Sequence, residues 1–367
     1  MIFGGDFLDI LQVCPFTFGE VGGVSEHVRN ISSRLAKRHA VTVYVTDSRK
    51  RFPKVELVDG VKVVRFRRYA PSNAYFLSGD MLLALRKASY DIVHAHAYHA
   101  FPMHFATLAK CKRFVVTPHF HGAGHSTFRN SLVMLLKPFG KRTLRLADKI
   151  VAVSEYEKNL IYSQFGFDSD KVVVVPNGVS LREFSGLKRN DHDGKHVLFV
   201  GNLFEYKGAQ YLVEVLPKLG QDVVLQIVGR GPFKRFLEKR AEALNVRDRV
   251  EFYDYLSRKD LLQKYVDSDL FVLLSRYEAY SLVVAEALVA GTPCIVANTS
   301  ALREWINNQT VFGIGFPINL GELSKTIAFV IGSDKPYCVT MRRMGNKILD
   351  WDDVTTRLEA IYQSTTS

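Results

Sequence analysis

Short apolar segments alternate with stretches of helical period along almost the whole chain, and this alternation limits the fold more than any other feature. In the first part of the sequence the apolar segments are residues 10–14, 41–45, 92–93, 114–116, 150–153 and 172–175. A helical stretch follows the first of them at residues 24–38. Strands that alternate with helices are typical of a parallel sheet whose strands are joined by crossover helices.

The same alternation begins again after the polar stretch 182–195. Its second series consists of residues 197–200, 223–228, 250–253, 270–274 and 294–296, and residues 351–362 form a closing helix. A chain of 367 residues is too long for one ordinary core. We therefore predict an α/β protein with two Rossmann-like, doubly wound domains at 1–182 and 183–347. The carboxyl ends of both sheets are expected to open into a cleft between them.

Two glutamates near the C-terminal end, Glu278 and Glu286, stand eight positions apart after a predicted strand. If Ser281 opens a helix between them, the free N–H groups of Ser281, Leu282 and Val283 can bind a diphosphate. Glu286 can then accept both hydroxyls of a ribose, and Glu278 those of a second sugar. The spacing therefore predicts a nucleotide-sugar site.

Three other loops between strands and helices have residues suited to phosphates. Gly22 and Gly23 follow the first strand, where glycines let backbone N–H groups approach an anion. In the second domain, Asn202 and Lys207 follow a strand, and Lys207 could neutralise a diphosphate leaving group. Arg230, between Gly229 and Gly231, is a possible second phosphate contact. None of these loops matches a dinucleotide fingerprint or a Walker loop.

Seven of the 11 histidines lie between residues 94 and 125. His94 and His96 would share one face of a strand, as would His119 and His121, which is compatible with a metal site. No carboxylate or cysteine has a characteristic ligand spacing, so we expect no metal ligands and no essential metal. We expect His119, at the end of a strand, to face the sugar.

The net charge of +12 is unevenly distributed. Residues 1–150 contain 23 Lys and Arg against 10 Asp and Glu, and the remainder contains 26 against 27, so the first part carries +13 and the rest −1. Such an asymmetry indicates an anionic partner for the first domain. The four cysteines, Cys14, Cys111, Cys294 and Cys338, show no paired spacing, which favours a reducing compartment. Neither a signal peptide nor a membrane span is indicated.

Taken in order, these segments resemble a retaining glycosyltransferase of family 4, with the GT-B fold. The resemblance rests on the following segments: 22–28, 91–96, 117–119, 153–154, 175–179, 207–208, 228–232 and 278–286. It implies that the second domain binds a nucleotide-sugar donor and the first binds the acceptor. It also implies that the last helix, within 348–367, packs back on the first domain, and that no cofactor is needed.

The resemblance assigns a role to most of the candidate residues. Glu286 would hold the ribose, Glu278 the donor sugar, and His119 the transferred sugar near the reacting carbon. The diphosphate would lie against residues 281–283 and Lys207. The chain departs from the family in three places: Asn202 replaces an arginine, Ser281 replaces a common glycine, and residues 299–302 replace paired glycines.

The basic first domain suggests an anionic acceptor. Basic and apolar side chains mix between residues 128 and 146, as in an interfacial amphipathic helix, although a core helix with a charged outer face has the same composition. Our hypothesis is a cytoplasmic enzyme, peripheral to the inner face of the membrane, that transfers a hexose from a UDP- or GDP-sugar to a lipid or lipid-linked glycan. Two alternatives stay open: another nucleotide-sugar enzyme, such as a hydrolase or epimerase, and a polyanion-binding protein. No nucleic-acid partner is expected.

Overall fold

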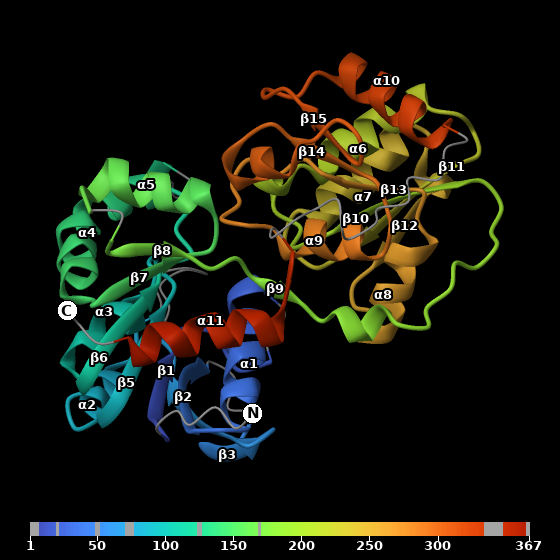
Figure 1. Ribbon diagram of the computed structural model, residues 1–367. Coiled ribbons are helices and arrows are strands. Elements are labelled where there is room, and N and C mark those ends of the chain that lie inside the picture. The colour runs from blue at the N-terminus through green and yellow to red at the C-terminus, as the bar shows by residue number, and fades with distance from the viewer. Residues whose placement is uncertain are drawn as a thin grey trace. The chain divides into compact units, whose positions relative to one another are not determined.

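The computed structural model describes residues 7–19, 22–47, 52–69, 77–122, 127–167, 170–333 and 348–364, with side chains of 127–136 excepted. The chain divides into two compact units. Unit 1 comprises Met1–Gly178 and Leu349–Ser367, and unit 2 comprises Val179–Ile348. Figure 1 labels the elements of both units.

Unit 1 contains an eight-stranded sheet with the order β3-β4-β2-β1-β5-β6-β7-β8. Its strands are β1 (Asp9–Val13), β2 (Ala40–Asp47), β3 (Val55–Val58), β4 (Val61–Arg67), β5 (Ser89–His96), β6 (Lys110–Thr117), β7 (Lys149–Ala152) and β8 (Val172–Val174). All neighbouring strands are parallel except the β3–β4 hairpin. The strand order reverses between β1 and β5, as in a doubly wound sheet.

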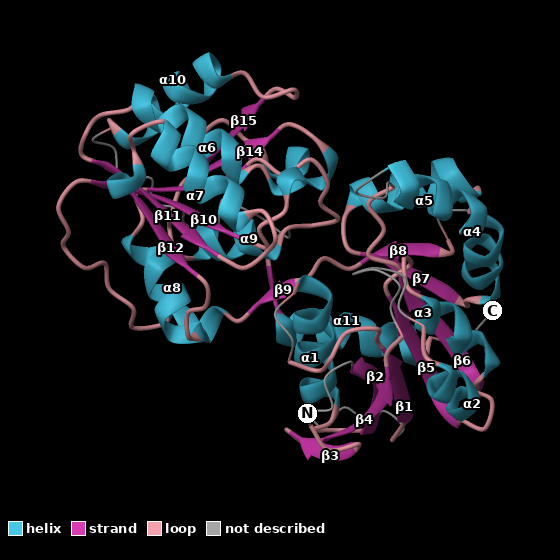
Figure 2. Cartoon of the chain, turned by 180° about the vertical axis from the view of Figure 1, so that it is seen from behind, coloured by secondary structure: helices cyan, strands magenta, loops and turns pink. Residues whose placement is uncertain are grey.

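Helices cover both faces of this sheet (Figures 1 and 2). They are α1 (Gly23–Leu35), α2 (Gly79–Leu85), α3 (Phe101–Phe105), α4 (Thr127–Leu146), α5 (Glu155–Phe165) and the C-terminal α11 (Trp351–Gln363). Helix α11 packs beside α1, where Arg34 Nε lies 2.7 Å from Asp352 Oδ1 and Arg38 pairs with Glu359. The last helix therefore belongs to unit 1, although the chain builds unit 2 before reaching it.

Unit 2 contains a six-stranded parallel sheet with the order β12-β11-β10-β13-β14-β15. Its strands are β10 (Lys195–Val200), β11 (Val223–Val228), β12 (Val250–Tyr253), β13 (Leu270–Leu273), β14 (Cys294–Ala297) and β15 (Val311–Ile314). Its helices are α6 (Ala209–Val215), α7 (Lys234–Ala243), α8 (Arg258–Asp267), α9 (Leu282–Val289) and α10 (Leu320–Ile331). Two short strands, β9 (Gly178–Val179) and β16 (Leu349–Asp350), pair where the chain leaves and re-enters unit 1.

The predicted fold class is confirmed for each unit, because both sheets are doubly wound and their strands are parallel except for the β3–β4 pair. All four residues of β13 in unit 2 are apolar and buried, whereas the central strands of unit 1 also bury the polar side chains of Gln12, His94 and His96. The hairpin of β3 and β4 was not predicted. Its turn contains Asp59 and Gly60 with φ of 50° and 79°, and an Asp-Gly pair between alternating strands is a hairpin signal that could have been used.

The polar stretch 182–195, predicted as a linker, is bonded to unit 2. Asn190 N donates to Asp267 Oδ1 over 2.8 Å, and Arg189 Nη2 lies 2.7 Å from Asp269 Oδ1. Three of the four cysteines, Cys14, Cys111 and Cys294, are free thiols, and Cys338 lies outside the described residues. Within the described part of the chain, the helices lack the length and apolar character that a membrane crossing requires.

Candidate functional site

The strand order of unit 2 reverses between β10 and β13, so the loops that follow these two strands diverge at the carboxyl edge of the sheet. Ligands of doubly wound proteins bind at this position. The loop after β10 carries Asn202 and Lys207, and the loop after β13 carries Glu278 and Ser281. The fold therefore brings four of the predicted site residues to one edge.

Gly208 allows the two loops to approach each other. It has a φ of 82°, and a Cβ atom at this position would lie 2.4 Å from the carbonyl oxygen of Leu274, at the end of β13. The amide of Arg276 donates to the carbonyl of Tyr206 over 2.8 Å. A side chain at position 208 would force the loops apart. The packing of the loops therefore requires Gly208, whereas the proposed chemistry requires Lys207.

Lys207 and Glu278 form an ion pair between these loops. Lys207 Nζ donates to Glu278 Oε1 over 2.6 Å, and both side chains are mostly buried. Burial works against the charge of Lys207, but the carboxylate of Glu278 outweighs it and the pKa of Lys207 is raised. Lys207 therefore stays charged beside the carboxyl group of Glu278, where the two loops meet.

The loop 299–302, one of the departures from the family, supports Glu278. Ser300 Oγ accepts a hydrogen bond from the Glu278 amide over 3.1 Å, and the Ala301 amide donates to the Glu278 carbonyl over 3.3 Å. Ser300 has a φ of 47°, in the left-handed region. The substituted residues thus fix the backbone of Glu278 in place of the glycines.

Helix α9 begins at Leu282, and Ser281 is its N-cap. The N–H groups of the first turn accordingly come from Leu282, Val283 and Val284, since the amide of Ala285 already bonds to the Ser281 carbonyl over 3.3 Å. Ser281 therefore stands at the N-terminus of the helix, as expected, but its side chain does not cap the helix. Ser281 has a φ of 87°, its side chain makes no capping bond, and its buried Oγ lacks a partner among the described residues. This conformation explains why glycine is favoured here.

Glu286 lies one turn into α9 and is 8% exposed. Arg258, the first residue of α8, donates from Nη1 to Glu286 Oε1 over 2.6 Å and from Nε to Glu183 Oε2 over 2.8 Å. Burial disfavours the charged guanidinium, but Glu286 and then Glu183 raise the pKa of Arg258 above its usual value. The sequence reasoning missed Arg258, because no motif marks it and its partners are 28 and 75 positions away.

Asn202 and Arg230 are exposed in adjacent loops of unit 2. The Leu203 amide donates to the Arg230 carbonyl over 2.8 Å, and added Cβ atoms at Gly229 and Gly231 would lie 1.9 and 2.1 Å from carbonyl oxygens of the facing loop. The guanidinium of Arg230 lies 5.7 Å from the ring centre of Tyr255. The glycines are thus needed for loop packing, and both polar side chains remain accessible to a ligand.

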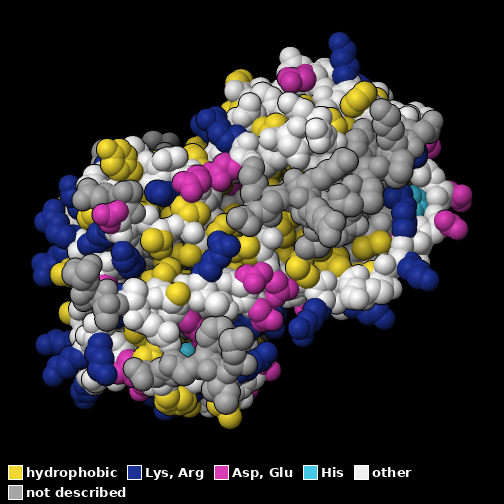
Figure 3. Space-filling model, in the orientation of Figure 1, with side chains coloured by type: hydrophobic (Ala, Val, Ile, Leu, Met, Phe, Trp, Pro, Cys, Tyr) yellow, Lys and Arg dark blue, Asp and Glu magenta, His cyan; other side chains and the backbone are white. Residues whose placement is uncertain are grey.

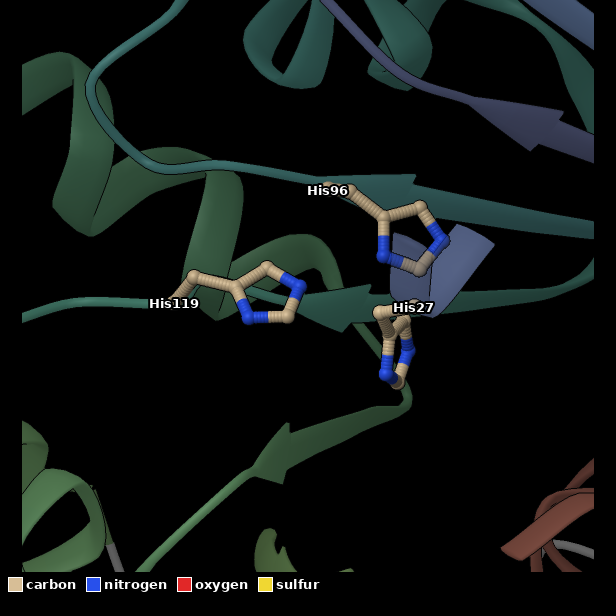
Figure 4. A group of neighbouring side chains, drawn as sticks. All are labelled: His27, His96 and His119. Carbon is tan, nitrogen blue, oxygen red and sulfur yellow. The ribbon is translucent and has the colours of Figure 1, made fainter. Parts of the chain in front are cut away.

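The corresponding switch point of unit 1 lies between β1 and β5. Gly22 is the N-cap of α1 and Gly23 its first residue, so the paired glycines begin a helix as expected. His27 lies on this helix, His96 ends β5, and His119 follows β6 with a φ of 48°. The three rings lie next to one another in Figure 4, and their centres are 5.1–5.9 Å apart.

Glu157 holds the backbone next to His119. Its Oε1 accepts from the Phe120 amide, and its Oε2 accepts from the Val153 amide over 2.7 Å. Burial raises the pKa of Glu157 to about 8, against the effect of these two hydrogen bonds. A buried carboxyl of α5 therefore fixes the end of β6 and with it the position of His119.

Some of the basic residues that were expected on the surface of unit 1 have internal partners. Arg65 is 7% exposed and pairs with Glu56 over 2.8 Å, and Arg68 donates to Thr46 Oγ1 over 3.0 Å. Residues 49–51 lie outside the described part of the chain. Arg65 and Arg68 hold β4 and its neighbours together, so they add little to an anion-binding surface.

Exposed basic residues remain on the last turns of α4. Lys141, Arg142 and Arg145 are exposed, and so are Phe139 and Leu146, by 65% and 52%. In Figure 3, Lys and Arg side chains gather along the left edge of the view, where Figure 1 places α4 and neighbouring elements of unit 1. We call this surface of basic and apolar side chains the α4 surface.

Two family models match consecutive parts of the chain. The model described as Glycosyltransferase Family 4 matches residues 21–183, and the model described as Glycosyl transferases group 1 matches residues 183–347. The chain belongs to glycosyltransferase family 4. It is a glycosyltransferase with the GT-B fold, as the resemblance implied.

Three relatives of this family member span most of its length. An uncharacterized glycosyltransferase of Methanocaldococcus jannaschii is 28% identical over 79% of this chain and 80% of its own. The GPI3 subunit of phosphatidylinositol N-acetylglucosaminyltransferase from Saccharomyces cerevisiae is 23% identical over 98% of this chain and 83% of its own. The UDP-Gal:alpha-D-GlcNAc-diphosphoundecaprenol alpha-1,3-galactosyltransferase of Escherichia coli is 27% identical over 76% and 75%.

Solved structures confirm the fold. Sucrose-phosphate synthase from Thermosynechococcus elongatus has a TM-score of 0.77 at 18% identity, covering 96% of this chain and 98% of its own. HepE of Anabaena, in complex with UDP, has a TM-score of 0.75 at 16% identity, covering 97% and 100%. At these identities the likeness extends to the fold of this family member and no further.

Proposed function

We propose that the protein transfers a hexose from a UDP- or GDP-sugar to an acceptor, with retention of the anomeric configuration. The observation that carries this proposal is the Lys207–Glu278 ion pair beside the N-terminus of α9, at the switch point of unit 2. A helix N-terminus and a lysine suit a diphosphate, and a carboxylate suits sugar hydroxyls. HepE, which shares the fold, was solved with UDP, and the E. coli relative is named for a UDP-sugar.

Each candidate residue has a role in this proposal. The first-turn amides of α9 and Lys207 bind the diphosphate, Glu278 binds the transferred sugar, and Glu286 binds the ribose. Asn202 and Arg230 provide further polar contacts at the rim. In unit 1, His119 faces the sugar, and Gly22 and Gly23 leave room for a ligand at the start of α1.

Catalysis then consists mostly of positioning and charge stabilisation. The bond between the anomeric carbon and the phosphate oxygen breaks while the acceptor oxygen attacks from the same face. The leaving phosphate takes the proton of the acceptor hydroxyl, and Lys207 and α9 stabilise its negative charge. Neither a metal ion nor a cofactor has a step in this sequence.

For the acceptor, we propose a lipid or lipid-linked glycan at the anionic cytoplasmic face of a membrane. The α4 surface supports this proposal because it combines exposed Lys and Arg with exposed Phe139 and Leu146. The yeast relative is named for phosphatidylinositol and the E. coli relative for a diphosphoundecaprenol-linked sugar. Both names describe acceptors with a lipid part and a phosphate.

A donor panel tests the transferase. Nucleotide release from UDP- and GDP-sugars is measured with and without an anionic lipid extract, beside Glu286→Ala. We expect release from one donor that depends on the extract and is lost in the variant, and a product whose anomeric proton coupling matches the donor. Release without an acceptor would indicate a hydrolase, and conversion of the sugar on its nucleotide would indicate an epimerase.

Cosedimentation tests the membrane contact. Vesicles with anionic lipid should bind the protein more strongly than neutral vesicles, and Lys141→Glu/Arg145→Glu should remove the difference. The matched control is Lys239→Glu, a charge change on α7 of unit 2. Equal binding to both kinds of vesicle would contradict the proposed membrane contact. It would not affect the proposal for the donor site.

A further inference from the structure

Three buried imidazole nitrogens in unit 1 lack a hydrogen-bond partner among the described residues. They are Nε2 of His27, Nδ1 of His96 and Nε2 of His119, on rings that are 0%, 0% and 9% exposed. Each of the three residues offers a nitrogen that lies within 4.8 Å of those of the others (Figure 4). Buried polar atoms are almost always paired, so three unpaired atoms on neighbouring rings point to a ligand-binding site.

Neighbouring amides decide which nitrogen of two of these rings is free. His27 Nδ1 lies 2.8 Å from Asn177 Oδ1, and His96 Nε2 lies 2.8 Å from Gln12 Oε1. An amide oxygen only accepts, so these two ring nitrogens carry the hydrogen and donate it. His27 Nε2 and His96 Nδ1 are left with lone pairs that can bind a ligand.

One of the two amides has a further hydrogen-bond partner. Gln12 Nε2 donates to the hydroxyl of Tyr362 over 3.3 Å, and that residue belongs to α11. A chain of hydrogen bonds therefore connects Tyr362 of the C-terminal helix, through Gln12, to His96 in the cluster. Hydrogen bonds of this kind behind a histidine orient metal ligands in known sites.

We propose that His27, His96 and His119 form a binding site for one divalent transition-metal ion, for which zinc is the best match. Three imidazoles with a fourth position open are a common zinc environment. The cluster contains no carboxylate oxygen, which disfavours magnesium and calcium. Zinc–nitrogen bonds of about 2.1 Å place tetrahedral ligand atoms about 3.4 Å apart, so the nitrogens, which lie within 4.8 Å of one another, must close in by about 1.4 Å at most.

His27 and His96 each have one hydrogen-bonded ring nitrogen, which leaves the other nitrogen for a ligand. The nearby His94 is different, because Tyr362 and Thr117 occupy both of its nitrogens, each over 2.7 Å.

A bound metal would affect the transfer reaction, and this consequence rests on the proposed function. His119 is assigned to the transferred sugar, and the metal would occupy its Nε2. Zinc should therefore inhibit transfer, and a chelator should restore it. This regulatory site is compatible with catalysis that needs no metal.

A titration with Co²⁺ alone tests the site directly, using the full chain after chelator treatment at pH 7. We expect one equivalent to bind with the strong visible absorption of four-coordinate Co²⁺, and Zn²⁺ to displace it. His27→Gln and His96→Gln should each weaken binding by more than about tenfold, since each loses a ligand. His104→Gln and His192→Gln, which change other histidines, should bind as the wild type does.

Asn177→Ala provides a variant that keeps all three ligands. It removes the partner of His27 Nδ1, and we expect Co²⁺ affinity to fall by about 10- to 100-fold while circular dichroism stays unchanged. Binding that is absent in the wild type, or that is as strong in His27→Gln and Asn177→Ala as in the wild type, would overturn the proposal. Stoichiometric binding without inhibition of transfer would support the metal site and contradict the role of His119 instead.

Discussion

Lys207 Nζ lies 2.6 Å from Glu278 Oε1, and this bond joins the loops that follow β10 and β13. The two residues are 71 positions apart, and they meet because β10 and β13 are neighbours in the sheet. Both are mostly buried before any ligand is present. The cation and the carboxylate proposed to bind the donor are therefore held in place by each other.

Lys207→Met should lower kcat/KM for transfer by about 100-fold, because it removes a cation from the developing phosphate charge. It also leaves the carboxylate of Glu278 buried without its partner, which costs stability. Steady-state kinetics, with folding checked by circular dichroism, measure the effect. Lys234→Met is the matched control, since Lys234 Nζ also lies 2.6 Å from a carboxylate, that of the exposed Asp254. A folded Lys207→Met with near wild-type kinetics would contradict the role of Lys207.

Arg258→Gln should weaken nucleotide binding through Glu286. Arg258 helps to orient this carboxylate and balances its charge, so its loss holds Glu286 less firmly in place. We expect KM for the donor to rise about tenfold, a loss of about 1.4 kcal/mol in binding, with a smaller change in kcat. Arg247→Gln is the control, on the same unit and away from Glu286. An unchanged KM would show that Arg258 has a structural role only.

Ser281→Gly should stabilise the ligand-free protein. The substitution removes the strain of a φ of 87° and a buried hydroxyl without a partner, at the cost of a more flexible unfolded chain. The expected gain is about 1 kcal/mol, or about 2–4 °C in the thermal midpoint. Differential scanning calorimetry measures the thermal midpoints of the variant and the wild type. A lower midpoint in the variant would mean that the serine hydroxyl stabilises the loop.

Stability should fall in acid partly through His104. This side chain bonds to Thr143 Oγ1 and to the Tyr98 carbonyl, and burial lowers its pKa from 6.5 to about 4. The unfolded chain takes up the proton first, so the contribution is complete above pH 6.5 and is lost as the pH falls toward 4. Each pH unit in this window costs about 1.4 kcal/mol at most.

Urea unfolding at pH 7.5, 5.5 and 4.5, with a chelator present, compares the wild type with His104→Gln. The difference between the two proteins should shrink at low pH, because the variant has no ring to protonate. A difference that is the same at all three pH values would show that the folded protein protonates His104 as readily as the unfolded chain.

The strands could be predicted because buried parallel strands are continuous apolar runs. Residues 223–228 and 250–253 are strands with the predicted bounds, and other core strands differ by a few residues at their ends. The hairpin of β3 and β4 was missed because β3 is short and both strands contain charged residues, one of which, Arg65, is buried in a salt bridge. A charged residue is therefore a poor guide to exposure, because an oppositely charged partner elsewhere in the sequence can allow it to be buried.

The part of the candidate site that lies within one continuous segment of the chain could be predicted from the sequence. Glu278, Ser281 and Glu286 belong to a single loop and helix, so their spacing was readable. Arg258 and the histidine cluster could not be found in this way. His27, His96 and His119 come from α1, β5 and the end of β6, and no periodicity relates residues that meet only through the order of strands in a sheet.

The most direct test of the central claim is the affinity for UDP and GDP, measured by isothermal titration calorimetry on the wild type and on Glu286→Ala. We predict that one of the two nucleotides binds with a one-to-one stoichiometry, and that the variant binds it at least about tenfold more weakly while remaining folded. A folded wild type that binds neither nucleotide, or a variant that binds as tightly as the wild type, would contradict the assignment of the donor site to α9 and its flanking glutamates.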